Sequence, residues 1–228
     1  MAELLAPAGS LDNVLTAIDA GADAVYFGGK SFNARRFAHN LDDEEIVRAV
    51  RTAHLFGVKV YVTVNILMAD TELDDLTIYL KSLDKAGVDG IIVQDMAVAL
   101  LARRVVPDLP LHGSTQMTVA DSDGVRFLEE NGFTQAVLSR ELSLADIQSV
   151  CASSPLAIEV FIHGASCMAY SGQCLMSSFL GGRSGNRGAC AQPCRQPYTL
   201  VRDGKAVMKQ EAYVLSLKDL KGLDYIDD

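Results

Sequence analysis

Short apolar runs follow glycine-containing turns at several points along the chain. The stretches Ala20–Asp23, Phe56–Lys59, Ala86–Asp89 and Asn131–Thr134 each contain one glycine and lead directly into such a run. Glycine in this place is suited to end a helix, because it adopts the left-handed conformation without a Cβ clash. Short β-rich apolar runs are typical of buried parallel strands. The repeat therefore predicts helices that alternate with strands.

Hydrophobic residues recur at helical spacing between the apolar runs. Ser10 is suited to cap the first of these helices, and the acidic stretch Asp42–Glu45 suits the positive end of the second helix dipole. The predicted helices cover Ser10–Ala20, Leu41–Leu55, Asp70–Lys85, Met96–Val106, Ala120–Glu130 and Ser143–Ala152.

Eight segments have the pattern of strands. They are Leu4–Ala6, Ala24–Phe27, Lys59–Asn65, Gly90–Gln94, Leu111–Gln116, Gln135–Ser139, Ala157–His163 and Tyr213–Leu217. Strands that alternate with helices imply a parallel sheet with right-handed crossovers. Eight such units favour an α/β fold of the (β/α)₈ TIM-barrel-like class over an open doubly wound sheet.

The stretch before the eighth predicted strand is much longer than a normal loop and helix. We interpret residues about 164–212 as a Cys-rich insertion between strands seven and eight of a single domain over residues 1–228. The last residues, from Lys221, look like the opening turns of an eighth helix. We therefore expect the sequence to be the N-terminal portion of a longer protein, truncated so that apolar barrel surface is left uncovered around Leu220 and Leu223.

Composition narrows the class of protein. Hydrophobic residues make up 49% and charged residues 21% of the chain, which is ordinary for a globular protein. The net charge of -9 argues against a protein that coats nucleic acid with its whole surface. The chain has no apolar run long enough for a membrane helix and no signal-peptide pattern at Met1–Leu5. We expect a cytoplasmic protein with reduced cysteines, no membrane contact and no need for disulfides.

Four of the five cysteines gather in the insertion. They are Cys167, Cys174, Cys190 and Cys194, whereas Cys151 stands apart. Four thiolates suit an iron–sulfur cluster or Zn²⁺, and four unligated thiols are the remaining alternative. We expect the four sulfurs to converge on one point and Cys151 to pack in the core from an outer helix.

The same region is basic. Residues 161–205 carry Arg183, Arg187, Arg195, Arg202 and Lys205 against Asp203 alone, a balance of +4, so the remainder of the chain carries -13. A basic, glycine-rich patch on an acidic protein could hold a phosphate backbone or a small anion. Alternatively, the arginines offset the charge of thiolates bound to a cluster.

Polar residues follow the predicted strands at the end where barrels build their sites. If the seventh strand alternates, Glu159, Phe161 and His163 share a face, and a buried carboxylate or imidazole is costly unless paired or functional. The other strand-end candidates are Arg35, Asn65, Gln94, Gln116, Arg140 and Glu141.

A peptidase is the weaker interpretation from the residues alone. His163 and Cys167 are close in sequence, but the members of a Cys–His dyad usually come from distant segments. Neither a His-Glu-x-x-His zinc motif nor a Gly-x-Ser-x-Gly elbow occurs in the sequence. Use of Cys167 as a nucleophile would also remove one of four plausible metal ligands.

Several motifs resemble one known family. The sequence EVFIHGASCMAYSGQCLMS over residues 159–177 is similar to the signature of the U-thirty-two peptidase family, also called collagenase-like. The stretches LLAPAG at 4–9, YFGG at 26–29, SREL at 139–142, and NRGAC at 186–190 with the following CR at 194–195 fit the same family. The resemblance covers nearly the whole chain.

The family name implies proteolysis, but better understood members form a group of RNA and ubiquinone hydroxylation proteins. The resemblance implies RNA base hydroxylation, of an rRNA cytidine or a tRNA wobble uridine, with RNA as partner and prephenate as a possible anionic cosubstrate. The short linker Val201–Ala212 is more similar to the rRNA branch. The resemblance also implies a four-iron four-sulfur (4Fe–4S) cluster on the four clustered cysteines, and further C-terminal domains of the same protein.

Roles for individual residues follow from this interpretation. Arg140, Glu141 and His163 are the candidate catalytic residues, and a base that enters the barrel mouth could stack on Tyr170. The substrate-binding candidates are Arg35, Asn65, Gln94, Gln116, Tyr170, Arg187 and Arg195. The alternatives are a genuine peptidase and a binding protein whose loop is stapled by zinc.

Overall fold

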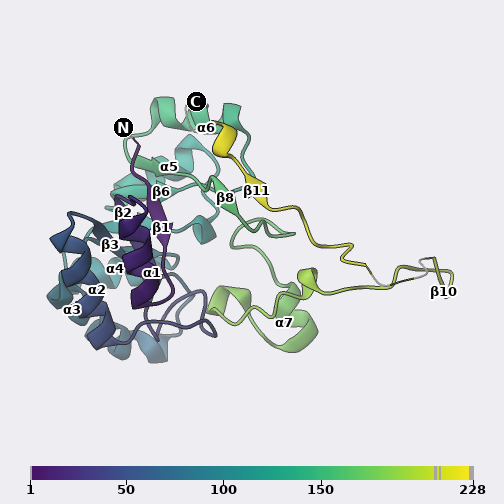
Figure 1. The fold of residues 1–228 in the computed structure, drawn as a ribbon, viewed down its shortest axis with the longest axis horizontal. Helices are drawn as coiled ribbons and strands as arrows, with labels where there is room; N and C mark the ends of the chain where they lie inside the picture. Colours follow the sequence, from purple (N-terminus) through teal and green to yellow (C-terminus); the bar gives the residue numbers. More distant parts are fainter. Residues whose placement is uncertain (1, 208–209, 211, 226–228) are drawn as a thin grey trace.

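Seven parallel strands form one sheet in the computed structural model, which describes residues 2–207, 210 and 212–225. The strands lie in chain order, and each pairs in parallel with the next. They are β1 (Leu5–Pro7), β2 (Ala24–Gly28), β3 (Lys59–Val64), β4 (Gly90–Val93), β5 (Leu111–Gly113), β6 (Gln135–Val137) and β7 (Ala157–Glu159). The sheet curls into part of a barrel (Figure 1), which confirms the predicted TIM-barrel-like α/β class.

A helix joins each pair of neighbouring strands. The helices are α1 (Leu11–Asp19), α2 (Asp43–Leu55), α3 (Leu73–Ala86), α4 (Met96–Val105), α5 (Ser122–Glu130) and α6 (Leu144–Ser153). Ser10 caps α1 by accepting a hydrogen bond from the Asn13 amide, and Asp42 and Glu45 form a capping box on α2. Gly87 ends α3 with a φ of 79°, as its place in the repeat predicts.

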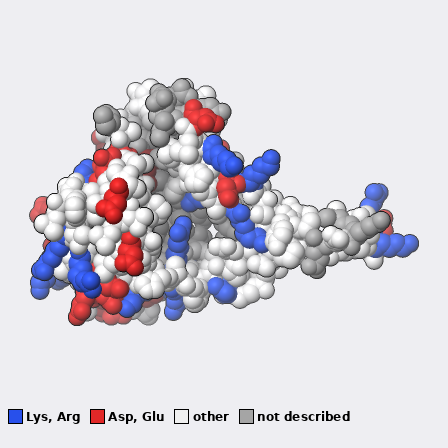
Figure 2. Space-filling view, in the orientation of Figure 1, with Lys and Arg blue, Asp and Glu red and all other residues white. Residues whose placement is uncertain are grey.

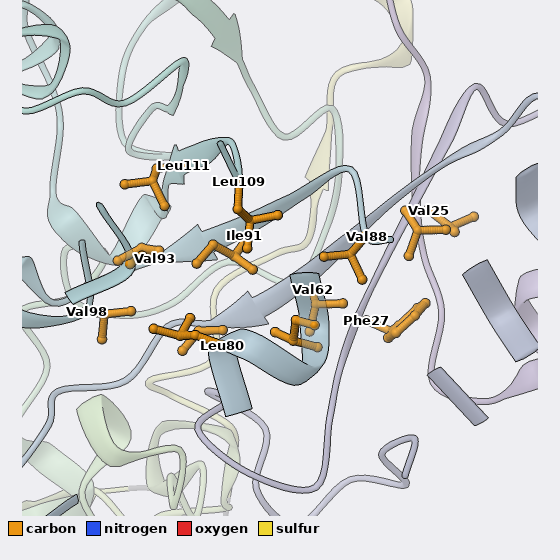
Figure 3. Packing of buried hydrophobic residues seen from close by; sticks show 14 of the residues in the cluster. Val25, Phe27, Val62, Leu80, Val88, Ile91, Val93, Val98, Leu109 and Leu111 are labelled. Atoms are coloured by element: carbon orange, nitrogen blue, oxygen red, sulfur yellow. The ribbon is translucent and has the colours of Figure 1, made fainter. Parts of the chain in front are cut away.

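The core lies between the helices and the sheet. Strand side chains such as Val62 and Ile91 pack against Leu80 of α3 and Val98 of α4 (Figure 3). Leu80 and Val98 are completely buried. Close packing of this apolar layer explains why periodicity alone located the six helices and seven strands, because each element buries its hydrophobic face here.

The eighth strand expected over Tyr213–Leu217 is wrong. The chain turns there, with the Ser216 amide bonded to the Tyr213 carbonyl, and Tyr213 is 64% exposed. The segment has strand-like residues but no sheet edge beside it, and such context overrides β-propensity. The seventh predicted strand also stops early, at Glu159. His163–Gly164 instead forms β8, which pairs antiparallel with β11 (Leu220–Lys221).

The insertion runs from β8 to β11, so it extends past the predicted limit at about residue 212. It contains α7 (Met176–Gly181), two short 3-10 turns, and a hairpin of β9 (Val201–Arg202) and β10 (Lys205–Ala206) that reaches far from the sheet (Figure 1). Leu223 is 57% exposed, and Leu220 is half-buried. The eighth helix expected from Lys221 is a 3-10 turn over Leu223–Tyr225, and residues 226–228 lie outside the described residues.

Among the described residues, every helix is too short or too polar to cross a membrane.

Candidate functional site

A cavity of about 630 Å³ opens at the carboxyl ends of the strands. Its lining includes Tyr26 of β2, Thr63 of β3 and Glu159 of β7, together with the loop after β2 and the insertion. Parallel strands present their carboxyl ends at one edge, so the polar residues that follow them gather at this mouth. The expectation that strands two to seven face one cavity is confirmed.

All four clustered cysteines line this cavity, whereas Cys151 lies elsewhere on α6. Burial raises the pKa of the Cys167 thiol, the Arg140 guanidinium lowers it, and the other three thiols raise it. The other three thiols therefore lie close enough to Cys167 to influence its charge. Within the described part of the chain, no three His, Cys, Asp or Glu side chains are placed to hold a single metal ion. Cys151 is exposed, so the expectation that it packs in the core is wrong.

Two glycines let the insertion approach the barrel closely. A Cβ atom on Gly172 would fall 2.0 Å from the Gln116 carbonyl oxygen, and one on Gly188 would fall 2.2 Å from the Asn33 carbonyl oxygen. Both glycines also have positive φ, of 79° and 71°. Only glycine meets both conditions without strain. These contacts set the cysteine-bearing loop against the ends of β2 and β5.

An ion pair connects the insertion to the short 3-10 turn Asp70–Glu72 that precedes α3. Arg187 donates to both carboxylate oxygens of Glu72 at 2.7 Å, and this contact lowers the pKa of Glu72 to about 2. The Leu67 amide donates to the Asn186 carbonyl beside it. Arg187 is therefore already occupied by a carboxylate and is absent from the described cavity lining.

Arg195, like Arg187, makes contacts that stabilise the insertion. It donates to the Ser166 carbonyl at 3.0 Å and to Ser216 Oγ at 3.2 Å, and it also stays outside the described lining. The structure thus places two predicted substrate-binding arginines in contacts that hold the insertion together.

Two other predicted arginines do face the cavity. Arg140 lies 4.0 Å from the centre of the Phe161 ring and donates to the Ala165 carbonyl, while its buried Nε has no partner among the described residues. Arg35 lines the opposite loop, where its amide donates to Asn33 Oδ1. The pair gives the cavity two cations, one of them with an unpartnered buried donor, which suits an anionic ligand.

The remaining predicted residues divide into two groups. Asn65, Gln116 and Tyr170 line the cavity, and Asn65 also accepts a hydrogen bond from the Ala34 amide. Glu141, His163 and Gln94 are absent from the described lining: Glu141 accepts two hydrogen bonds from Ser171, His163 lies in β8, and Gln94 is buried with its Oε1 unpartnered.

Two residues that line the cavity were given no role from the sequence, although the inward-facing carboxylate of Glu159 was noted. Burial raises the pKa of Glu159 to about 7, although a hydrogen bond from Gln135 Nε2 at 2.6 Å opposes this shift. Burial also raises the pKa of Tyr26, which senses the charges of Glu159, Arg35 and Arg140. The inward face of β7 was the available signal for Glu159. For Tyr26, the signal was a tyrosine within a buried strand that leads to the same mouth.

Curated proteins of known name are similar to the chain. It is 45% identical to the 23S rRNA 5-hydroxycytidine C2501 synthase of Escherichia coli over 95% of this chain and 33% of that protein. It is 41% identical to tRNA hydroxylation protein P1 of Bacillus subtilis over 98% and 54%, and 35% identical to a collagenase of Porphyromonas gingivalis over 99% and 57%. The chain thus spans from a third to somewhat over half the length of these relatives.

Solved structures support the fold. The U32 peptidase Mk0906 superposes with a TM-score of 0.63 over 73% of this chain and 70% of that chain, at 15% sequence identity. The model of peptidase family U32 matches residues 9–228. The cavity therefore lies within a sequence region that defines a family, and the chain belongs to peptidase family U32.

Proposed function

We propose that this chain is the catalytic region of an RNA base hydroxylase whose four clustered cysteines hold a 4Fe–4S cluster. The observation that carries the proposal is the shared cavity: Cys167, Cys174, Cys190 and Cys194 line the same space as the strand ends and two arginines. Relatives named for rRNA and tRNA hydroxylation support RNA as the substrate class. An RNA substrate also fits the expected cytoplasmic location.

The donor set fits such a cluster. A 4Fe–4S cluster is held by four cysteine thiolates, each bound to a different iron, so its ligand sulfurs lie farther apart than the ligands of a single ion. Zinc instead requires all its ligands within about 2.3 Å of one ion. Cys167, Cys174, Cys190 and Cys194 would hold the cluster, which supplies redox or Lewis-acid chemistry when bound.

The cavity has room for a base and a small anion. Its volume of about 630 Å³ lies within the usual range for ligand sites. Arg35 and Arg140 would bind the carboxylates of a cosubstrate of the prephenate class, and Tyr170 would stack on the base.

Glu159 would accept and release a proton in the cavity. Replacement of a ring hydrogen by a hydroxyl group is a two-electron oxidation of the base: the cosubstrate would give up the oxygen and accept the two electrons, and the ring hydrogen would leave as a proton. With a pKa of about 7, the Glu159 carboxyl exchanges protons readily near neutral pH. Tyr26, beside it, would orient the base through its hydroxyl group.

Proteolysis is the weaker alternative for this cavity. A cysteine nucleophile needs a lowered thiol pKa and a neighbouring base. Burial instead raises the pKa of Cys167, and His163 is absent from the described lining. A zinc-stapled binding protein is the third candidate, and metal analysis distinguishes it from the first.

Nucleoside analysis tests the proposal. Cells that lack the full gene are complemented with the wild type, Cys174→Ser or Cys151→Ser, and their rRNA and tRNA nucleosides are measured by mass spectrometry. We expect one hydroxylated pyrimidine to disappear in the deletion and to return with the wild type and Cys151→Ser only. A nucleoside profile that the deletion leaves unchanged would overturn the proposal.

A further inference from the structure

Two segments at the cavity mouth are free of acidic residues. Residues 24–41 and 160–202 contain no Asp or Glu, although the whole chain has 29. Both segments supply lining residues, from Tyr26 to Asn40 and from Phe161 to Cys194. Figure 2 shows acidic side chains spread over the barrel and basic ones along its border with the insertion. The charged side chains of the two segments are all basic, and Glu72 and Asp219 nearby are paired with arginines, so the border suits a polyanion.

An aromatic ring and an arginine join the two segments. The Arg183 guanidinium carbon lies 4.7 Å from the centre of the Phe37 ring, yet Phe37 remains 67% exposed. Its neighbours Arg35 and Ala38 line the cavity, so the ring stands at the rim. Arg183 also donates from Nε to the Ala189 carbonyl, which fixes the plane of the guanidinium. One side of the ring is stacked on a cation, and much of its surface stays open.

A second aromatic stands on α7. Phe179 is 84% exposed, whereas Met176 and Ser177 of the same helix line the cavity. The loop after β2 and α7 lie near each other at the same end of the molecule (Figure 1). Large exposed apolar side chains that gather beside a basic border mark a binding surface more often than chance exposure.

We propose that Phe37, stacked on Arg183, and Phe179 form a rim that stacks the unpaired bases next to the nucleotide that enters the cavity. This inference rests on the proposed RNA function and adds the substrate form, a single strand at the mouth. Bases stack on aromatic rings and guanidinium planes regardless of sequence, while nearby arginines attract the phosphates. The two exposed rings favour RNA over an acidic peptide, because an acidic peptide would also be attracted by the arginines but carries no bases to stack on the rings.

Binding of a labelled oligonucleotide tests the rim. Fluorescence anisotropy would follow a fluorescein-labelled uridine strand of about 12 nucleotides and an abasic strand of equal length. The variants are Phe37→Ala and Phe179→Ala. Phe56→Ala is the matched control, since Phe56 is 65% exposed at the end of α2, away from the cavity. We expect each rim variant to bind the uridine strand about tenfold more weakly and the abasic strand unchanged.

Other results would overturn the rim. Equal weakening by Phe56→Ala, or equal affinity of the wild type for both strands, would show that stacking at this place contributes nothing. Loss of self-association in the rim variants, with RNA binding intact, would assign the surface to a second copy of the chain. Because binding is measured without turnover, stacking that persists while hydroxylation is absent would contradict the proposed function and leave the rim standing.

Discussion

The barrel and the insertion are held together by different means. All buried hydrophobic residues of the described chain lie between Ala8 and Val150. Beyond Val150, the described residues that are fully buried with polar side chains are Ser171 and Ser177. The barrel therefore folds around an apolar core, whereas the insertion rests on the barrel through polar and backbone contacts.

Under the proposed function, this difference gives the four cysteines a structural role as well. A long segment without an apolar core of its own gains little from burial and needs cross-links to keep one conformation. The ion pair between Arg187 and Glu72 supplies one fastening, and a group bound by four thiolates would supply a far stronger one. The insertion thus forms one wall of the cavity, and it is also the part of the fold that has no apolar core of its own.

Serine substitution of the cysteines should have the largest effect, and this effect should fall on the insertion and not on the barrel. Each of Cys167→Ser, Cys174→Ser, Cys190→Ser and Cys194→Ser should lose bound iron and lower hydroxylation by about a hundredfold or more, because each removes a cluster ligand. Circular dichroism should show the barrel intact. Iron per chain is the measurement, and Cys151→Ser is the control. Equal iron loss in all five variants, or none in any, would refute the ligand set.

Truncation in the core should have the opposite effect. Leu80→Ala removes a completely buried side chain and should lower the free energy of unfolding by about 3 kcal/mol. Leu180→Ala, at a residue that is 66% exposed on α7, should leave this free energy almost unchanged. Urea denaturation followed by circular dichroism measures both. Similar losses in the two variants would mean that the insertion shares the core of the barrel.

Glu159, which lines the cavity, should make the free energy of unfolding depend on pH. Its pKa rises from 4.5 to about 7 on folding, so the folded chain binds the proton more tightly than the unfolded chain. Stability should therefore fall as pH rises from about 4.5 to about 7, by at most roughly 3 kcal/mol. Glu159→Gln should flatten this dependence and stabilise the barrel at pH 8.

The control is Glu130→Gln, which changes an exposed side chain on α5. Urea midpoints at pH 5 and pH 8 give the comparison. A Glu159→Gln chain with the same pH dependence as the wild type would rule out a buried carboxyl as the source.

Loss of the Glu72 fastening should have the smallest effect. Glu72→Gln leaves Arg187 without its carboxylate and should cost about 1 kcal/mol of local stability, since the pair is partly exposed. With the pKa of Glu72 at about 2, this stabilisation is complete above its usual 4.5 and is lost as pH falls toward 2.

Hydrogen exchange at the amides of Leu67 and Gly188 should quicken, and the urea midpoint should stay within error. Asp123→Asn, which breaks an exposed pair with Arg126 on α5, should leave these amides unaffected.

Sequence patterns predicted the barrel well because its helices and strands are determined by residues that are close together in the sequence. Helical spacing and capping residues such as Ser10 and Asp42 define elements whose apolar faces must be buried. The eighth strand failed because the segment at Tyr213 has strand residues without a neighbouring edge. Whether a strand finds a partner that is distant in the sequence cannot be predicted from a short stretch of residues.

The site shows the same division. Spacing singled out the four cysteines, and the structure places them around one cavity. Arg187 and Arg195 were assigned to substrate because the cysteine region is basic. Their actual partners could not be seen in the sequence, since Glu72 lies 115 residues from Arg187, and Ser166 and Ser216 lie in separate segments from Arg195. Tyr26 was missed because a buried strand hides which side chain ends at the mouth.

Hydrogen exchange before and after anaerobic removal of iron tests the central claim most directly. The account predicts that exchange in residues 164–195 quickens by tenfold or more, while the strands β1–β7 and helices α1–α6 keep their protection. Uniform quickening across the barrel, or unchanged protection in the insertion, would contradict the claim that a cluster on its cysteines orders this region while an apolar core orders the barrel.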